Sequence, residues 1–337
     1  MLLNQDYVTP AELTGYARAA LADQDRNQFT LSRWLPVQVV DDLQYRFTRG
    51  GEGLIDAATF RAYDAESPIG SRPGATRVTG ELPPISRKIR LGEYDRLRQR
   101  RDNGAIRDVI LSDAERMTRA VAARLELARG EALYRGQLTI SENGVVATVD
   151  FGRAGGHTVA PGTLWSVVAT ATPLADLLTW RDTYINTNGE APGAILTSTT
   201  VLGYLLRNAE IRALAATTAG TPTIVSQSTV NAVFAAYGLP PIYIYDAQVR
   251  VNGSAARVIP ADRVVMLPEP GSSQLGATLH GTTAESLEPE FGLTGDEPGI
   301  VAGAYSTKDP VAVWTKAATI GLPVLANPDL TLAADVA

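Results

Sequence analysis

Residues 112–151 read SDAERMTRAVAARLELARGEALYRGQLTISENGVVATVDF. The first four, Ser112-Asp113-Ala114-Glu115, match a helix capping box, in which the hydroxyl and the carboxylate satisfy backbone N–H groups at a helix start. Apolar residues then recur at spacings of three and four, which predicts one buried helix face. These residues are Ala114, Met117, Val121, Leu125, Ala128 and Ala132. With Gly136 as the C-terminal cap, the pattern predicts a long helix over residues 112–135.

A β-hairpin is predicted directly after this helix. Two β-branched runs flank Asn143-Gly144, a dipeptide that favours the tight turn of a two-residue hairpin loop. The hairpin is expected to cover residues 137–151.

The N-terminal region predicts a short helix and an extended strap. Thr9 is a suitable N-cap and Pro10 a suitable first helical residue, so we expect a helix over 9–21. Residues 31–40 are expected to be extended. This order suggests an arm laid on another surface, although an edge strand and a helix of one globule would have the same pattern.

Residues 45–90 form a long excursion that is rich in Gly, Pro, Arg and Thr. Short β-like pieces occur at 59–63 and 76–79. Loops of this length are uncommon inside compact domains, and a two-stranded ribbon is only marginally stable alone. We therefore expect a ribbon that is supported from outside its own chain.

The second half of the chain predicts a mixed α/β domain of about 130 residues, near the usual domain size. Helices are expected over 173–186, 199–212 and 228–237, and strands over 194–197, 241–245 and 258–267, with Pro260 marking a break or an edge. Further β-like runs lie at 311–315 and 330–332.

Composition limits the chemistry. The 337 residues suggest about two domains. The absence of cysteine excludes disulfides, thiolate metal sites and a cysteine nucleophile. His157 and His280 are the only histidines, and packing roles are favoured for both over catalysis.

The acidic stretch 285–297 lacks the residue spacing of a calcium-binding loop. No stretch is apolar enough for a membrane helix, and the N-terminus lacks the features of a secretory signal.

A basic run is the strongest candidate contact surface. It faces only Glu93 and Asp95, so it could meet phosphates or the carboxylates of a partner, or simply be a solvated face. Its members are Arg87, Lys88, Arg90, Arg96, Arg98, Arg100 and Arg101.

The order of these elements resembles that of tailed-phage major capsid proteins, which share the α+β fold first seen in the phage Hong Kong 97 head. More narrowly, it is similar to the lambda major head protein family. The matching stretches are 113–151, 175–212 and the closing run 314–324, which begins Trp314-Thr315-Lys316.

The resemblance implies a division of the chain into five parts. These are an N-arm (1–44), an E-loop that lies across a neighbouring subunit (45–92), a peripheral domain (93–165) with the spine helix 112–135 and the hairpin 137–151, an axial domain (166–300), and a C-terminal segment (301–337) that returns to the peripheral domain. It also implies a structural protein of the virion that forms an icosahedral head shell from pentamers and hexamers, without catalysis, metal or cofactor.

The partners implied are other copies of the chain, the portal, packaged double-stranded DNA bound non-specifically and, in some shells, a decoration protein. An arm that begins at Met1 suggests a separate scaffolding protein or none, and Lys88 alone near the E-loop suggests no lysine–asparagine crosslink. Two alternatives are an encapsulin-type compartment shell and a soluble α/β hydrolase that uses serine or carboxylates. A deep pocket that holds His157 or His280 beside an acidic partner would favour the hydrolase.

Overall fold

The structure is a computed structural model that describes residues 2–3, 7–40, 43–49, 76–98, 103–142, 144–216, 220–272, 274–288, 291, 293, 299–309 and 311–337. The chain divides into two compact units. Unit 1 contains residues 1–45, 79–130 and 277–324, and unit 2 contains 46–78, 131–276 and 325–337.

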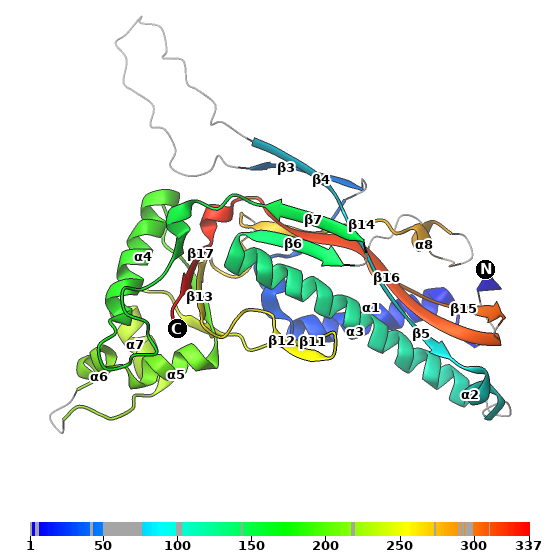
Figure 1. Cartoon of the computed structure of the whole chain (residues 1–337), viewed down its shortest axis with the longest axis horizontal. Helices are drawn as coiled ribbons and strands as arrows, with labels where there is room; N and C mark the ends of the chain where they lie inside the picture. Colours follow the sequence, from blue (N-terminus) through cyan, green and yellow to red (C-terminus); the bar gives the residue numbers. More distant parts are fainter. Residues whose placement is uncertain are drawn as a thin grey trace, which may run out of the picture. The chain divides into compact units, whose positions relative to one another are not determined.

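Unit 1 is built on a six-stranded sheet. Its main path runs β1 (Leu2–Leu3), β15 (Val301–Lys308), β16 (Val311–Leu325), β14 (Gly276–Gly281) and β2 (Val37–Val39). Strand β5 (Pro84–Leu91) also pairs with β16, antiparallel, and places Leu91 opposite Val313. The sheet thus joins segments from the start, the middle and the end of the chain (Figure 1).

Two helices cover one face of this sheet: α1 (Pro10–Asn27) and α3 (Asn103–Arg135). Their apolar side chains meet those of β5, β15 and β16 in a common core. Burial of this kind stabilises by about 25 cal/mol per Å² of apolar surface. The core members are Val8, Leu13, Ala17, Leu91, Ile106, Ile110, Ala114, Ala302, Ala304 and Val313.

The spine helix begins nine residues earlier than the capping box predicts, since α3 starts at Asn103 rather than at Ser112. Ile106 and Ile110 extend the apolar stripe towards the N-terminus, and both are almost completely buried. Asp113 is buried within the helix instead of marking its start, and burial raises the pKa of its carboxyl group. Tertiary packing of the stripe therefore outweighs the local capping signal.

The N-terminal strap is not extended throughout, as its sequence predicts. A short 3-10 helix, η1 (Thr30–Arg33), precedes β2, and Leu31 and Trp34 are buried. Burial of these two apolar side chains favours a compact turn there. The helix predicted over 9–21 is confirmed and runs on to Asn27.

The predicted ribbon contains the paired strands β3 (Gln44–Arg49) and β4 (Thr76–Glu81). A Cβ atom at Gly80 would overlap the end of the buried Tyr45 ring, so a larger residue there would force the ring to move. The β-like piece predicted at 59–63 falls outside the described residues.

The predicted hairpin is confirmed as β6 (Gln137–Glu142) and β7 (Val145–Asp150). The strands pair antiparallel from Gln137 opposite Asp150 to Glu142 opposite Val145. Gly144 has a φ of 85°, the left-handed value that the turn requires. Its neighbour Asn143 lies outside the described residues.

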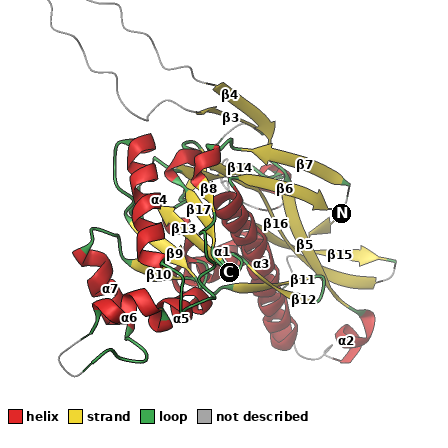
Figure 2. Cartoon of the chain, turned by 60° about the vertical axis from the view of Figure 1, so that its left-hand side comes forward, coloured by secondary structure: helices red, strands yellow, loops and turns green. Residues whose placement is uncertain are grey.

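Unit 2 contains a five-stranded mixed sheet in the order β10 (Ile242–Ile244), β9 (Ala194–Thr197), β13 (Arg263–Leu267), β17 (Leu332–Asp335) and β8 (Thr158–Val159). A hairpin of β11 (Gln248–Val251) and β12 (Ser254–Arg257) lies between β10 and β13 in sequence. Figure 2 shows the helices of this unit gathered beside its sheet. They are α4 (Pro173–Asn188), α5 (Thr199–Arg207), α6 (Ala209–Leu214) and α7 (Gln227–Ala236).

Three expectations for this half need correction. The helix predicted over 199–212 is two helices, because Asn208 adopts an extended conformation and its side chain accepts hydrogen bonds from the first turn of α6. The strand predicted over 258–267 is confined to 263–267, after Pro260. The run at 330–332 is instead the end of the 3-10 helix η4 (Pro328–Leu330) and the start of β17.

Among the helices that lie in the described residues, none combines the length and the apolar character that crossing a membrane requires.

Candidate functional site

The structure divides the basic run between two elements of unit 1. Strand β5 carries Arg87, Lys88 and Arg90. The short helix α2 (Glu93–Arg98) carries Arg96 and Arg98. The last two members, Arg100 and Arg101, fall outside the described residues.

The two faces of β5 receive different parts of the run. Side chains alternate along a strand, so Lys88 and Arg90 share one face while Arg87 lies on the other. On that other face Ile85 and Ile89 pack against the apolar core of α3. All three basic side chains are exposed, and none of them makes an ion pair with any part of the chain that the structure describes. The basic residues of β5 therefore lie on two faces of the strand and do not form one continuous basic surface.

Aromatic rings lie next to the Lys88 face. The Lys88 ammonium is 4.5 Å from the ring centroid of Trp314, a geometry that permits cation–π attraction. Trp314 also stacks on Tyr305, with ring centroids 6.5 Å apart and ring planes 14° apart. Lys88, Trp314 and Tyr305 thus form a row across three adjacent strands, which we call the aromatic–cation row.

A second lysine sits directly opposite the first. Lys88 and Lys316 are paired residues of β5 and β16, and like charges at such positions repel. Lys316 forms an ion pair with Glu285 on helix α8 (Ala284–Leu287), which offsets this repulsion.

Sequence reasoning identified the basic residues but missed Trp314, Tyr305 and Glu285 as their neighbours. More than 190 residues separate each of them from Lys88, and only the strand order brings them together. Trp, Tyr and Arg side chains are enriched in protein interfaces, so this face suits contact with another protein.

Helix α2 carries exposed apolar side chains between its charges. Tyr94 is 74% exposed and Leu97 is 54% exposed. The charges of this segment are evident from the sequence, whereas no sequence pattern singles out these two residues. A large exposed aromatic ring on a helix is informative because nothing in the described part of the chain covers it.

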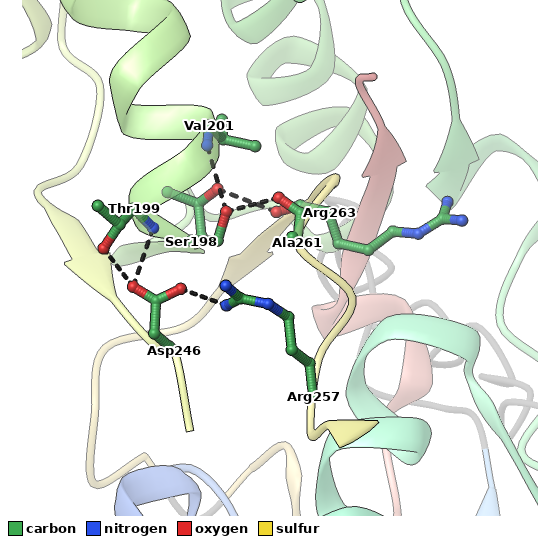
Figure 3. A network of polar contacts seen from close by, with 8 residues as sticks. Ser198, Thr199, Val201, Asp246, Arg257, Ala261 and Arg263 are labelled. Atoms are coloured by element: carbon green, nitrogen blue, oxygen red, sulfur yellow. Dashed lines mark hydrogen bonds and ion pairs between the residues drawn. The ribbon is translucent and has the colours of Figure 1, made fainter. Parts of the chain in front are cut away.

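A separate polar network in unit 2 fixes the start of α5 (Figure 3). Asp246 accepts hydrogen bonds from the backbone N–H and the hydroxyl of Thr199, and it forms an ion pair with Arg257 at 2.5 Å. Burial alone would raise the pKa of Asp246, but these hydrogen bonds and the Arg257 charge lower it below its usual value. The Asp246 carboxylate therefore connects the start of α5 with the end of strand β12.

Ser198, beside this network, has the role of a helix cap rather than of a nucleophile. Its hydroxyl donates to the carbonyl of Ala261 at 2.5 Å and accepts from the N–H of Val201 at 3.2 Å (Figure 3). Both bonds restrain the oxygen within the fold.

Both histidines are buried and have neutral partners. In unit 2, His157 Nδ1 donates to the carbonyl of Thr331 at 3.2 Å, and its Nε2 lies 3.0 Å from the Thr187 hydroxyl. In unit 1, His280 Nδ1 lies 3.2 Å from the Thr319 hydroxyl. Within the described residues neither ring contacts a carboxylate, as a hydrolytic triad would require. This geometry favours packing roles.

The acidic stretch does not assemble into a metal site in the part of the chain that is described. Glu285 pairs with Lys316, and Glu288 is exposed. Three further members, Glu290, Asp296 and Glu297, lie outside the described residues.

A buried charged network ties the N-terminal strap to the spine helix within unit 1. Glu126 accepts from the N–H of Leu31 at 3.0 Å and from Arg129 at 3.0 Å. Arg129 also donates to the hydroxyl of Thr278 at 2.9 Å, and that hydroxyl donates to the carbonyl of Leu35 at 2.9 Å. Both charged side chains are at least 97% buried, so this network fixes where the strap lies.

In unit 2, Arg153 performs a comparable task for the end of α3. Its guanidinium donates to the carbonyls of Leu133 and Tyr134 and to the hydroxyls of Thr158 and Thr331. Burial lowers its pKa to about 10. The network connects the helix end with the C-terminal segment.

Comparison with solved structures shows that this fold is the one used by capsid proteins. A protein assigned as the capsid protein of an E. coli CFT073 prophage superposes with a TM-score of 0.65 at 15% identity, covering 96% of this chain and 99% of that chain. A phage-related protein from Bordetella bronchiseptica RB50 gives 0.61 at 13% identity, covering 98% of each chain. The capsid of Cyanophage P-SCSP1u gives 0.50 at 10%, covering 90% and 86%. The predicted α+β fold of the Hong Kong 97 type is confirmed.

Sequence comparison identifies the family. No curated protein matches the chain significantly. The profile of the family described as phage major capsid protein E matches residues 49–336, most of the chain, and confirms the resemblance drawn from the order of elements. The chain belongs to the phage major capsid protein E family.

Proposed function

We propose that this chain is the major head subunit of a tailed phage and that it assembles through pentamers and hexamers into an icosahedral shell around double-stranded DNA. The observation that carries the proposal is the family match over residues 49–336. The same match favours a phage head over an encapsulin-type compartment and over a hydrolase. The subunit works as a building block, without catalysis and without a cofactor.

The five-part division of the chain is part of this proposal. The N-arm (1–44) and the E-loop (45–92) reach neighbouring subunits, the peripheral domain (93–165) and the axial domain (166–300) form the body, and residues 301–337 return to the peripheral domain. Support for that return comes from β16, which pairs with β5 and shares a core with the spine helix.

The buried Glu126–Arg129 network supports the assignment of an arm. It holds the strap at Leu31 and Leu35 by hydrogen bonds to backbone atoms, so the path of the strap does not depend on side chains that a neighbour would have to supply. A fixed exit direction lets every copy present its arm in the same way, as closed symmetry requires.

The partners proposed are other copies of this chain, a scaffolding protein, the portal, a decoration protein and packaged DNA bound through its phosphates. The aromatic–cation row and the exposed Arg87 are proposed contact positions, together with Arg90 and the basic residues of α2. Cations of this kind pair with carboxylates or phosphates.

Particle size tests the proposal. The purified chain, expressed alone and with its scaffolding protein, is examined by sedimentation and negative-stain microscopy. Closed shells, tubes, or rings of five and six copies are the expected result. A monomer or dimer that never assembles under either condition would contradict the proposal, and shells filled with a co-purifying cargo protein instead of DNA would favour the encapsulin alternative.

A further inference from the structure

Strand β7 is an edge strand with exposed, uncharged side chains. Residues 145–149 read Val-Val-Ala-Thr-Val, and Asp150 follows at the end of the strand. Val146 is 81% exposed, and Ala147 and Thr148 are exposed as well. Among the strands that the structure describes, β6 is the only one that pairs with β7 (Figure 1). Within the described chain, one long edge of β7 therefore has no strand beside it.

The hydrogen-bond pattern of the hairpin shows which backbone groups face that edge. In an antiparallel pair, successive residues alternate between directing their N–H and C=O groups at the partner strand and away from it. The Phe151 N–H donates to the Gly136 carbonyl at 3.1 Å, which sets the phase of this alternation. Along the register of the hairpin, Val146 and Thr148 therefore direct their N–H and C=O groups away from β6. Each of these two residues offers one donor and one acceptor to a second strand.

This edge lacks the features that keep edge strands of monomeric proteins single. Those features are a lysine or proline on the edge, a β-bulge, or a covering segment. Residues 145–149 contain no charge and no proline. Their register with β6 runs without a bulge, from Glu142 opposite Val145 to Gln137 opposite Asp150. A regular, exposed edge of this composition favours pairing with another strand.

The order of residues in β7 matches an antiparallel copy of the same strand. About Ala147 the strand reads nearly the same in both directions, because Val146 and Thr148 have β-branched side chains of similar shape. When Ala147 lies opposite Ala147 of a second copy, Val146 of each copy lies opposite Thr148 of the other. These are the residues whose backbone groups point outward, so each such pair exchanges both of its backbone hydrogen bonds. The small Ala147 then occupies the central position, where facing residues approach most closely.

Other registers of the same two strands are less favourable. Displacing one copy by a single residue sets outward-pointing groups against inward-pointing ones. Displacing it by two residues in one direction places the Asp150 carboxylate opposite the apolar Val146. The opposite displacement sets Thr148 against the hairpin turn at Gly144 and shortens the ladder. The register centred on Ala147 avoids all three faults.

We propose that β7 pairs with β7 of a second copy of this chain, antiparallel and centred on Ala147, so that the two hairpins form one continuous sheet. The pairing deepens the proposed function, on which it rests for its place between shell subunits. A second copy suits the edge better than nucleic acid does, because residues 145–149 offer no cation to phosphates. The contact is two-fold, with one surface matching itself, so it joins subunits of neighbouring rings rather than closing a ring.

Cysteine crosslinking tests the register directly, because the chain contains no cysteine of its own. In Ala147→Cys the two Cα atoms would lie about 4.5 Å apart, inside the range of about 4.4–6.8 Å that a disulfide spans. In Thr148→Cys, the matched control, the two cysteines would be diagonal neighbours about 7–8 Å apart. Both proteins are oxidised with diamide, as purified chain and as particles, and run on non-reducing gels. We expect at least about fivefold more linked dimer from Ala147→Cys than from Thr148→Cys.

Proline substitution in the Ala147→Cys chain tests the backbone hydrogen bonds. Thr148→Pro removes an N–H that points to the second copy, so the amount of linked dimer should fall by about fivefold or more. Thr139→Pro is the matched control, since Thr139 is the cross-strand partner of Thr148 and its N–H faces the opposite edge of the hairpin. It should leave the amount of linked dimer nearly unchanged. Neither substitution removes a bond between β6 and β7, and far-UV circular dichroism verifies that each variant folds.

The outcomes separate this contact from the proposed function. Equal amounts of linked dimer from the two cysteine variants, or an excess from Thr148→Cys, would overturn the pairing centred on Ala147. Equal losses from the two proline variants would overturn the assignment of the open edge of β7 as the contact. Shells without linked dimer from Ala147→Cys would overturn the contact alone. Linked dimer from a chain that never forms shells would support the contact and contradict the proposed function.

Discussion

His280 is held in its neutral form by its surroundings. Burial of the ring is the larger cause and the charge of Arg129 is the smaller one. Together they lower the pKa of His280 from 6.5 to about 4. Arg129 is itself paired with Glu126, while Thr319 is the hydrogen-bond partner of the ring. Protonation of the imidazole in the folded state would place a second cation in this buried region.

This lowered pKa predicts a loss of stability in acid. Between pH 6.5 and about 4 the unfolded chain binds the His280 proton more tightly, so stability is complete above 6.5 and falls as the pH decreases through this window. The slope from one group is at most about 1.4 kcal/mol per pH unit. In thermal unfolding across this range, the unmodified chain should lose stability relative to His280→Asn as the pH falls. Parallel pH profiles would contradict this explanation.

Gly193 illustrates a steric limit that one atom imposes. A Cβ at this position would lie 2.5 Å from the backbone nitrogen of Glu269 and 2.7 Å from its Cα, neither of which can move independently. We expect Gly193→Ala to destabilise the fold by about 1–3 kcal/mol in denaturant unfolding.

Gly203 provides the matched control. It lies within α5, and its nearest neighbour would be the flexible end of Arg207 at 3.9 Å. Gly203→Ala should stabilise the fold by about 0.5–1 kcal/mol, because alanine favours helix. Equal effects from the two substitutions would show that the close approach at Gly193 has no consequence.

At the scale of elements, the Glu126–Arg129 pair joins α3, β14 and the strap. Arg129→Met should destabilise the fold strongly, by about 3–5 kcal/mol, since it leaves the Glu126 carboxylate buried beside an apolar side chain. The double variant Glu126→Gln/Arg129→Met removes both charges and keeps an acceptor for the Leu31 N–H. It should therefore be more stable than Arg129→Met alone.

Denaturant unfolding of the unmodified chain, Glu126→Gln, Arg129→Met and the double variant measures the coupling between the two residues. Amide hydrogen exchange at Leu31 reports whether the strap stays in place. Additive effects, with Leu31 protected in every variant, would mean that the pair does not hold the strap.

For the whole molecule, the described members of the two core clusters of unit 1 and the strands of the five-stranded sheet of unit 2 all come from segments outside residues 50–75. Replacing residues 50–75 with a short Gly/Ser linker should therefore leave cooperative unfolding intact. Under the proposed function it should abolish shells, because the E-loop contact with a neighbour is lost.

Denaturant unfolding of this variant and of the unmodified chain tests whether the fold stays cooperative. Sedimentation of both proteins tests whether shells form. Shells of normal size from the shortened chain would exclude an essential role for the ribbon between subunits. Failure to fold would contradict the independence of the cores.

Local patterns in the sequence were sufficient for the long helix, the hairpin and the capsid resemblance. An apolar stripe at helical spacing and an Asn-Gly turn act over a few residues, so they are visible without a partner. Local signals also misled, because Ser112-Asp113-Ala114-Glu115 has the form of a helix start and lies inside α3, where packing of Ile106 and Ile110 extends the helix.

The sequence by itself thus determined the long helix, the hairpin, the fold class and the family. Only the tertiary structure decided which residues share a surface. Lys88 meets Trp314 because β5 inserts beside β16, and Glu126 meets Leu31 because the strap returns across the spine helix. Strand order and burial set such contacts, and both depend on the free energy of the whole fold rather than on any short segment.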